Sequence, residues 1–395
     1  MVNYIFATEE QKEFAMGARE IMEKELLPRI DELEKADDSH GEFPMDVFQK
    51  LVDAGYYGMN IPEEYGGLGL DQVTQALIIE EMSKIDVGFT FSFYNMGTYF
   101  PQILQTSMPE EEKRAWAEKI LSGEARGTFA VTESSAGSDA GAMRTTAVLD
   151  GDEWVINGSK TFITSAPVAN FVLVAAWTDK TKRASEGVTF FFVEKERGWE
   201  VGRKEYKMGL KLSETAEVIF DNVRVPKDHV IGEVGKGFGT ALGIISTEGR
   251  TLGTAMNLGL AEAALDKAIE YAKERRQFGK RIIDFQGVGY LIADMQARTD
   301  ACRAFLYETL QGIVNGKPVS KRVASEIKCY VSDCTMQTCT DAVQVLGGYG
   351  YMHEYMTEKY MRDAKIFQIF SGTNQIQRNT VMKEIAGRDP QKAKK

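Results

Sequence analysis

The sequence predicts an α+β protein in which helices come first, a β domain follows and helices return. Strand-like segments begin near residue 128 and end before residue 238, and the long helical patterns lie outside this stretch. A chain of 395 residues is long enough for two or three domains with their own cores. We expect an N-terminal helical domain at 1–127, a middle antiparallel β-barrel or sandwich at 128–237 and a C-terminal four-helix bundle at 238–395.

The first part of the chain has the apolar spacing of amphipathic helices. Apolar residues recur at helical intervals, with charged residues between them, at Phe14, Ala18, Ile21, Met22 and Leu26. Pro62 and the pair Gly66-Gly67 then interrupt the pattern, as expected of a turn. A second helical pattern runs from Gln72 to Lys84, so we predict helices on both sides of this turn.

The middle part consists of short β-branched and aromatic runs bounded by glycine and aspartate. We expect strands at 128–132, 145–149, 153–157, 171–175 and 188–193. No helix-length run separates them, which favours an antiparallel barrel or sandwich over a dinucleotide-binding sheet. The glycines of 235–239 loosely resemble a dinucleotide-binding loop, but their spacing differs from GxGxxG, so we predict a simple loop before a helix.

Long helical patterns fill the C-terminal part. They cover residues 241–272, 285–314 and 319–346, and Gly316-Lys317-Pro318 separates the last two. These lengths are typical of the helices of a bundle.

Composition and charge exclude several classes of function. The net charge is −11, with 58 acidic and 47 basic residues, so we expect no nucleic-acid partner. No run of 18 apolar residues occurs and the N-terminus lacks a signal-peptide pattern, so we expect no membrane insertion and a cytoplasmic location. The cysteines lack metal-site spacing and the three histidines are scattered, which predicts reduced thiols and no metal site.

Six segments in the middle and C-terminal parts carry a more specific signal. They are 129–139, 157–164, 274–286, 344–350, 361–365 and 372–377. Their residues, order and spacing resemble those of the acyl-CoA dehydrogenase family. The resemblance extends over nearly the whole chain and implies the same helix–β–helix architecture.

The resemblance implies a bound FAD, whose ring and phosphates need protein donors and a cover. In the β domain the implied cofactor contacts are Phe129, Val131, Thr132, Gly137, Ser138, Phe162, Ile163 and Thr164. Thr132 and Thr164 would supply hydroxyls to the ring, and Phe162 would flank it. Ser138 would meet both the flavin phosphates and the thioester arm of the substrate.

The C-terminal domain supplies a second set of implied FAD contacts. They are Arg275, Phe278, Gln286, Gln344, Gly347, Gly348, Thr373 and Gln375. In the family the arginine and the 344–348 loop reach the flavin of a neighbouring subunit, where a guanidinium suits pyrophosphate. The resemblance therefore implies a homotetramer, and also implies electron transfer to an electron-transferring flavoprotein and no nicotinamide site.

The sequence departs from the family at the catalytic base. The family reaction needs a carboxylate that removes the α-proton of the thioester while the β-hydride passes to the flavin. Its usual position is occupied by Ser371, and the other known position, just before Arg250, is Gly249. Glu248 lies one residue away, about 100° around a regular helix, so only a local distortion would turn it toward the substrate. The catalytic candidates are therefore Ser371, Glu248 and Arg250, although a serine hydroxyl needs a partner to act as a base.

The substrate is predicted less closely than the cofactor. Phe89 and Phe93 belong to an aromatic segment that matches the family's acyl-cavity wall, so they either shorten that cavity or pack in the core. With Ser138 and Arg250 they form the predicted substrate-binding set. We expect an acyl-CoA dehydrogenase acting on a short, cyclic or unsaturated acyl-CoA with an atypical proton acceptor. The alternatives are an enoyl-CoA reductase, a flavin monooxygenase or oxidase, and a non-catalytic flavoprotein.

Overall fold

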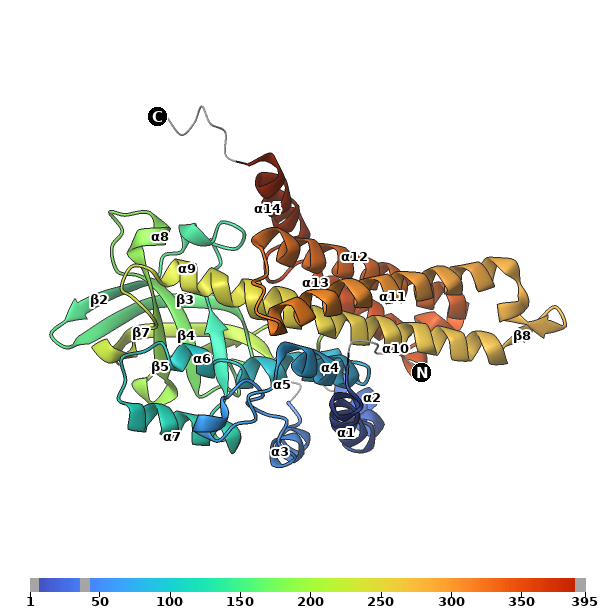
Figure 1. Ribbon diagram of the computed structural model, residues 1–395, viewed down its shortest axis with the longest axis horizontal. Helices are drawn as coiled ribbons and strands as arrows, with labels where there is room; N and C mark the ends of the chain where they lie inside the picture. The colour runs from blue at the N-terminus through green and yellow to red at the C-terminus, as the bar shows by residue number, and fades with distance from the viewer. Residues whose placement is uncertain (1–6, 36–42, 388–395) are drawn as a thin grey trace.

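The computed structural model describes residues 7–35 and 43–387, apart from the side chains of residues 247 and 248. The β domain lies at one end, and the long helices of residues 253–346 extend away from it toward the other end (Figure 1). The smaller N-terminal helices pack beside both parts. This is the predicted α+β order of helical domain, β domain and helical domain.

The N-terminal domain contains seven α-helices among the described residues. They are α1 (Glu9–Glu25), α2 (Ile30–Lys35), α3 (Met45–Asp53), α4 (Gln72–Ser83), α5 (Val87–Gly97), α6 (Phe100–Ile103) and α7 (Glu110–Leu121). Thr8 caps α1, because its side chain accepts from the backbone N–H of Gln11 while the Gln11 side chain accepts from that of Thr8. Helix α4 is buried on nearly all sides, which identifies it as the central helix of this domain.

The middle domain is one curled sheet with a short helix, α8 (Ala184–Gly187). Its strands are β1 (Gly127–Ala130), β2 (Thr146–Asp150), β3 (Glu153–Thr164), β4 (Phe171–Trp177), β5 (Val188–Glu194), β6 (Glu200–Lys204) and β7 (Thr215–Pro226). The order is β1-β4-β2-β3-β7-β6, with β5 paired to β4. Most pairs are antiparallel as predicted, but β4 runs parallel to β1 and, at one residue pair, to β2.

The C-terminal domain begins with one long interrupted helix. It consists of α9 (Gly237–Ile244), a π-helical segment (Ile245–Leu252) and α10 (Gly253–Glu274). A small hairpin of β8 (Arg276–Gln277) and β9 (Lys280–Arg281) follows. The remaining helices are α11 (Gln286–Val314), α12 (Lys321–Leu346), α13 (Thr357–Phe367) and α14 (Asn374–Ala386).

A buried charge network joins the N-terminal domain to the bundle. Arg303 on α11 lies 2.7 Å from Glu80 on α4 and 2.6 Å from Glu262 on α10. Lys84 lies 3.0 Å from the same Glu262, whose pKa is raised to about 7 by burial. Removing one partner from such a network is costly, so these pairs fix how α4 packs on the bundle.

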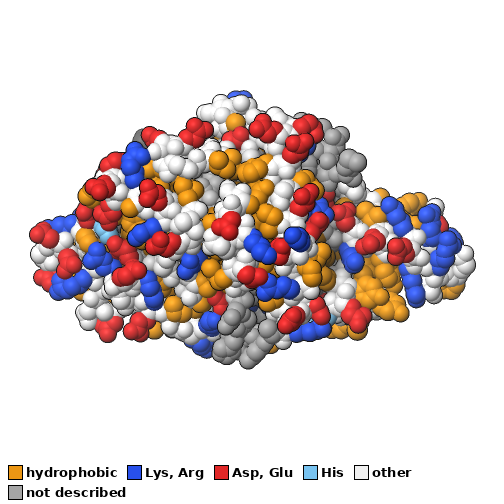
Figure 2. All heavy atoms as spheres, turned by 90° about the horizontal axis from the view of Figure 1, so that it is seen from below, with side chains coloured by type: hydrophobic (Ala, Val, Ile, Leu, Met, Phe, Trp, Pro, Cys, Tyr) orange, Lys and Arg blue, Asp and Glu red, His pale blue; other side chains and the backbone are white. Residues whose placement is uncertain are grey.

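Two features of the surface bear on the predicted partners. Acidic and basic side chains are interspersed on the face shown in Figure 2, and apolar side chains gather toward the bundle end. Within the described ranges, no helix combines the length and apolar character needed to cross a bilayer.

Candidate active site

Ser371 lies in a tight turn between α13 and α14 that neighbouring side chains hold in place. Ser371 has φ 53° and Gly372 has φ 87°, so two successive residues are in the left-handed region. Gln377 Nε2 donates to the carbonyl oxygens of both residues, at 3.0 and 2.9 Å. Lys328 Nζ donates to the Gly372 carbonyl at 2.8 Å. The position of residue 371 is therefore set by contacts to the backbone of the turn and is independent of its own side chain.

Lys328 extends this support to the start of α14. Its Nζ also donates to Asn374 Oδ1 at 2.8 Å, and the Asn374 amide in turn donates to Asp333 on α12. Lys328 is 3% exposed, and burial lowers its pKa to about 8. Together Lys328 and Asn374 tie α12 to the Ser371 turn.

The two positions where the family places its base face each other. A Cβ added at Gly249 would lie 2.9 Å from Ser371 Oγ. Gly249 is part of the π-helical segment, so the helix is distorted at the place where the sequence allowed a distortion. Glu248 also lies in this segment, but its side chain is outside the described residues. The structure thus brings Ser371, Gly249 and Arg250 together.

Arg250 is buried beside the turn without a carboxylate partner among the described residues. It is 8% exposed, and desolvation lowers its pKa. Its contacts are Nε to the Ser371 carbonyl at 3.4 Å and Nη1 to Ser246 Oγ at 3.2 Å. Both are long, so the guanidinium retains most of its hydrogen-bonding capacity.

Helix α5 connects this turn to the β domain. Asn95 Nδ2 donates to the Thr164 carbonyl at 3.5 Å, and the Phe91 ring lies 5.0 Å from that of Phe370, next to Ser371. Phe91 belongs to the aromatic segment predicted to form the acyl-cavity wall, although only Phe89 and Phe93 were predicted as substrate contacts. Its position could have been found, because on a helix it lies on the opposite side from Phe89 and Phe93.

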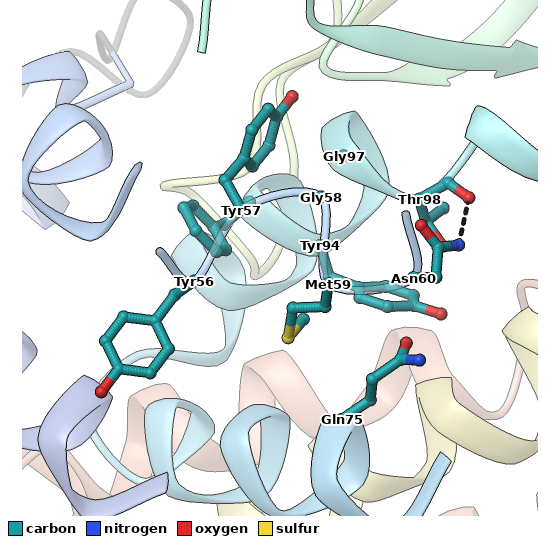
Figure 3. Close-up of a pocket in the computed structure, with 10 residues that line it drawn as sticks. Tyr56, Tyr57, Gly58, Met59, Asn60, Gln75, Tyr94, Gly97 and Thr98 are labelled. Atoms are coloured by element: carbon teal, nitrogen blue, oxygen red, sulfur yellow. Dashed lines mark hydrogen bonds between the residues drawn. The ribbon is translucent and has the colours of Figure 1, made fainter. Parts of the chain in front are cut away.

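Phe89 and Phe93 point into the core of the N-terminal domain. The Phe89 ring stacks on Phe43 at 5.0 Å, and Phe93 packs against Phe48 and Tyr57. The cavity beside Phe93 has a volume of only about 10 Å³ (Figure 3), room for no more than one water molecule. In this conformation both rings pack in the core, and their role as acyl-cavity walls stays a prediction.

The β-domain cofactor candidates lie on β1, β3 and the adjoining loops. The Thr161 N–H donates to the Thr132 carbonyl at 2.9 Å, which places the Thr132 loop beside β3. Phe162 is 62% exposed at φ 59°, whereas Ile163 and Val131 are buried. Phe129 and Thr164 are half-buried, and Gly137 and Ser138 are exposed. An aromatic ring presented to solvent from a strained backbone suits a surface that another group covers.

Glu133, which sequence reasoning missed, holds the loop that carries Ser138. Its carboxylate lies 2.8 Å from Lys160 and accepts hydrogen bonds from the backbone N–H groups of Arg144 and Thr145. It thereby closes the loop onto β2 and β3. A single glutamate gives no sequence signal for such a structural role.

The remaining cofactor candidates occupy other parts of the molecule. Arg275, Gly347 and Gly348 line one hollow of about 430 Å³, where the Arg275 guanidinium lies over the Tyr349 ring. Gln277 of β8 also lines this hollow, and β8 lies at the end of the bundle opposite the β domain (Figure 1). Nearby candidates are Phe278, which is 93% exposed, and the exposed Gln286 and Gln344. Thr373 caps α14 next to the exposed Gln375, so the sixteen residues form separate groups within one chain.

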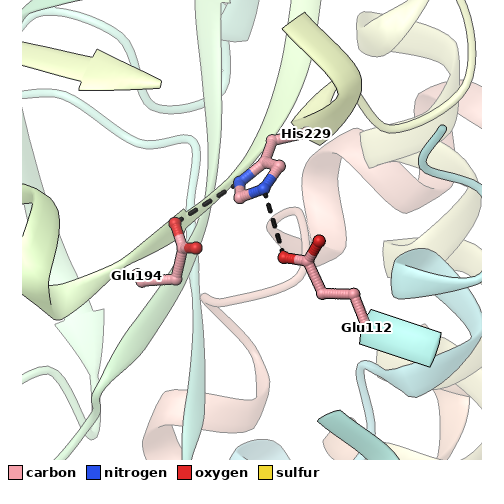
Figure 4. Close-up of side chains that lie close together, drawn as sticks. All are labelled: Glu112, Glu194 and His229. Carbon is pink, nitrogen blue, oxygen red and sulfur yellow. Dashed lines mark ion pairs between the residues drawn. The ribbon is translucent and has the colours of Figure 1, made fainter. Parts of the chain in front are cut away.

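A further group of titratable side chains joins α7 to the β domain. His229 Nδ1 lies 3.3 Å from Glu194, and Nε2 lies 3.6 Å from Glu112 (Figure 4). Among the described side chains, this is the only group of three or more His, Cys, Asp or Glu residues whose potential metal-binding atoms lie within 4.8 Å of one another. Each ring nitrogen faces a different carboxylate, whereas a metal ion binds one nitrogen of a histidine. We therefore interpret the group as a structural contact.

The comparisons with known proteins agree with the arrangement of domains. The chain matches the N-terminal, middle and C-terminal domains of acyl-CoA dehydrogenases at residues 8–124, 128–223 and 235–386. It is 40% identical over 373 residues, 94% of each chain, to FadE25 of Mycobacterium tuberculosis, a probable acyl-CoA dehydrogenase. It is 38% identical over 379 residues to the caffeyl-CoA reductase–Etf complex subunit CarC of Acetobacterium woodii, covering 95% of this chain and 98% of CarC.

A solved structure gives the same result in three dimensions. Butyryl-CoA dehydrogenase from Megasphaera elsdenii superposes with a TM-score of 0.90 at 35% identity, covering 96% of this chain and 99% of that one. The chain therefore belongs to the acyl-CoA dehydrogenase family of flavoprotein oxidoreductases.

Proposed function

We propose that this chain binds FAD and oxidises or reduces a short, cyclic or unsaturated acyl-CoA without a carboxylate at the usual base position. The observation that carries this proposal is the contact between Ser371 and Gly249. Both family positions for the base meet there, and neither residue has a carboxylate. FAD, when bound, supplies a hydride acceptor and donor for the β-carbon of the thioester.

Several observations support the fit of FAD to this chain. Phe162 presents an exposed ring on β3, and the loop of Ser138 is held in place by Glu133. Arg275 and the two glycines Gly347 and Gly348 line an open hollow where a phosphate oxygen can approach both a guanidinium and backbone N–H groups. Since these parts lie at opposite ends of one chain, we propose that FAD binds between subunits of a homotetramer.

The residues of the site then have distinct tasks. The backbone N–H of Ser371 polarises the thioester carbonyl, which makes the α-proton more acidic. Gln377 and Lys328 hold the turn so that this N–H keeps its direction. Arg250 holds the Ser371 carbonyl from the other side. What these residues lack is a strong proton acceptor.

The reductase direction is the second candidate, and the Phe91–Phe370 pair beside Ser371 favours it. Two half-buried rings form an aromatic wall that suits a flat, conjugated acyl group. A reduction needs a proton donor at the α-carbon in place of a base, and a serine hydroxyl or water can donate. The relative CarC is named as a subunit of a caffeyl-CoA reductase–Etf complex, and we propose an electron-transferring flavoprotein as partner here too.

Anaerobic titration of the purified holoenzyme tests both candidates. The measurement is flavin absorbance during addition of saturated, alicyclic, enoyl and arylacryloyl CoA thioesters, with the oxidised or the dithionite-reduced enzyme. We expect bleaching by an alicyclic or unsaturated acyl-CoA, or reoxidation by an enoyl-CoA, at rates well above those with butyryl-CoA. A flavin that responds to no thioester but reacts rapidly with oxygen would instead indicate an oxidase or monooxygenase. No response to either would indicate a non-catalytic flavoprotein.

A further inference from the structure

Two buried cations flank the Ser371 turn, and no described carboxylate forms an ion pair with either. Arg250 lies on one side and Lys328 on the other. Lys328 has two close oxygen acceptors, the Gly372 carbonyl and Asn374 Oδ1, each at 2.8 Å. Arg250 has only two long contacts, so it is the cation whose burial is poorly compensated.

The free part of the Arg250 guanidinium faces the turn. Its Nη2 atom accounts for two of the five N–H donors and has no hydrogen-bond partner among the described residues. A Cβ added at Gly372 would lie 3.6 Å from Nη2, so this nitrogen lies beside the backbone of the turn. A planar guanidinium edge with free donors is the group that proteins use to bind a carboxylate through paired hydrogen bonds.

Ser371 completes the arrangement. Its side chain is half-buried, reaches toward Gly249 and provides a hydroxyl donor next to the arginine. A Cβ at Gly249 would lie 2.9 Å from Ser371 Oγ and a Cβ at Gly372 would lie 2.7 Å from Gln377 Nε2, so a ligand can approach only from the half-exposed side of Ser371. A carboxylate at this place would compensate the buried charge of Arg250 and accept from the Ser371 hydroxyl.

We propose that Arg250 and Ser371 form a carboxylate-binding subsite beside the reacting carbons of the thioester. The carboxylate comes from the acyl group itself, which would make the substrate the mono-thioester of a dicarboxylic acid, or from a small free carboxylate ion. The first source rests on the proposed thioester chemistry, whereas the second does not.

Binding of a free carboxylate ion is tested by thermal unfolding of the holoenzyme in sodium acetate and in sodium chloride at equal ionic strength. A ligand that binds the folded state raises Tm, so acetate should raise Tm above its value in chloride. R250M should lose this difference, which also controls for general salt effects. S371E should lose it as well, because its own carboxylate fills the subsite. If R250M fails to fold, S371E still decides the result.

The substrate carboxylate is tested by comparing succinyl-CoA with butyryl-CoA, which has the same chain length. Dissociation constants come from the change in flavin absorbance on binding. If the acyl group supplies the carboxylate, succinyl-CoA binds about tenfold or more tightly, and R250M abolishes the preference. Equal Tm in acetate and chloride together with equal binding of the two thioesters would overturn the subsite. If no thioester changes the flavin absorbance, the proposed function is rejected, but the effect of acetate on Tm can still be interpreted.

Discussion

At the scale of single residues, the Ser371 turn depends on its neighbours. Ser371 has a left-handed backbone conformation, which disfavours any residue with a side chain. Gln377, Lys328 and Arg250 all donate to the carbonyl oxygens of the turn, and these contacts offset the strain. The same backbone can therefore present a serine or a glutamate to the substrate.

Lys328 is expected to position this turn. K328M should keep its flavin but lose up to about 10²-fold in kcat, because the Gly372 carbonyl and Asn374 lose their common donor. K328R retains a donor and should recover part of the rate. Steady-state kinetics and flavin content measure both effects. A K328M enzyme with normal kcat would contradict a positioning role.

The same lysine predicts a pH dependence of stability. Burial lowers its pKa to about 8 in the folded protein, from 10.5. Between these values the unfolded chain binds more protons, so the free energy of unfolding rises as pH increases from 8 to 10.5. K328M should show a smaller rise than wild type in urea unfolding across this window. An identical rise in both proteins would mean that burial does not lower the pKa of Lys328.

Some of these residues could be predicted from the sequence, and others could not. Ser371 and Arg250 belong to motifs with fixed spacing, so their proximity was expected, and the structure places them together. Lys328 is a polar residue within a helical pattern and Gln377 ends the last family-like segment, and only the tertiary packing shows that both are buried and contact the turn. The structural role of Glu133 could not be predicted for the same reason, because its partners are distant in the sequence.

At the scale of elements, the π-helical segment sets the distance between the long helix and the Ser371 turn. The sequence predicted one continuous helix at 241–272 and allowed for a distortion at Gly249. The strands β6 and β7 were not predicted. β6 is short and largely polar, whereas the alternating burial of β7 matches a period of two that was visible in the sequence. The parallel pairing of β4 with β1 depends on long connections and has no local signal.

A methyl group at Gly249 tests this contact. The added Cβ of G249A would lie 2.9 Å from Ser371 Oγ, closer than such atoms approach, so the Ser371 side chain must rotate or the turn must move. We expect G249A to reduce activity, and the S371G change to restore part of it in the double variant by removing Oγ. Additive losses in this double-mutant cycle, measured as kcat/KM, would show that the two residues are not in contact.

At the scale of the whole molecule, the residues predicted to bind FAD lie in two separate parts of the chain. Phe162 lies in the β domain and Arg275 at the opposite end of the bundle (Figure 1). If FAD binds between subunits, one site combines Phe162 of one chain with Arg275 of another. A change in either residue then damages both sites of a homodimeric pair.

Co-expression of two inactive variants tests the shared site. F162E and R275E should each lose FAD when expressed alone. In a mixed pair, one site combines the two intact halves and the other combines both altered halves. Co-expressed chains should therefore regain up to about half of the flavin of wild type in mixed pairs. No recovery in a mixed oligomer, confirmed by differently tagged chains, would place the whole site within one subunit.

We propose that this enzyme retains a turn that polarises the thioester but lacks the carboxylate that takes the α-proton in its family. The most direct test is the rate of anaerobic flavin reduction by butyryl-CoA in wild type and in S371E. A missing base is typically worth about 10²–10⁴ in rate, so S371E should reduce its flavin faster by that factor at equal flavin content. Equal, fast reduction in both proteins would contradict the claim. Another base must then exist, and loss of activity in E248Q would identify Glu248.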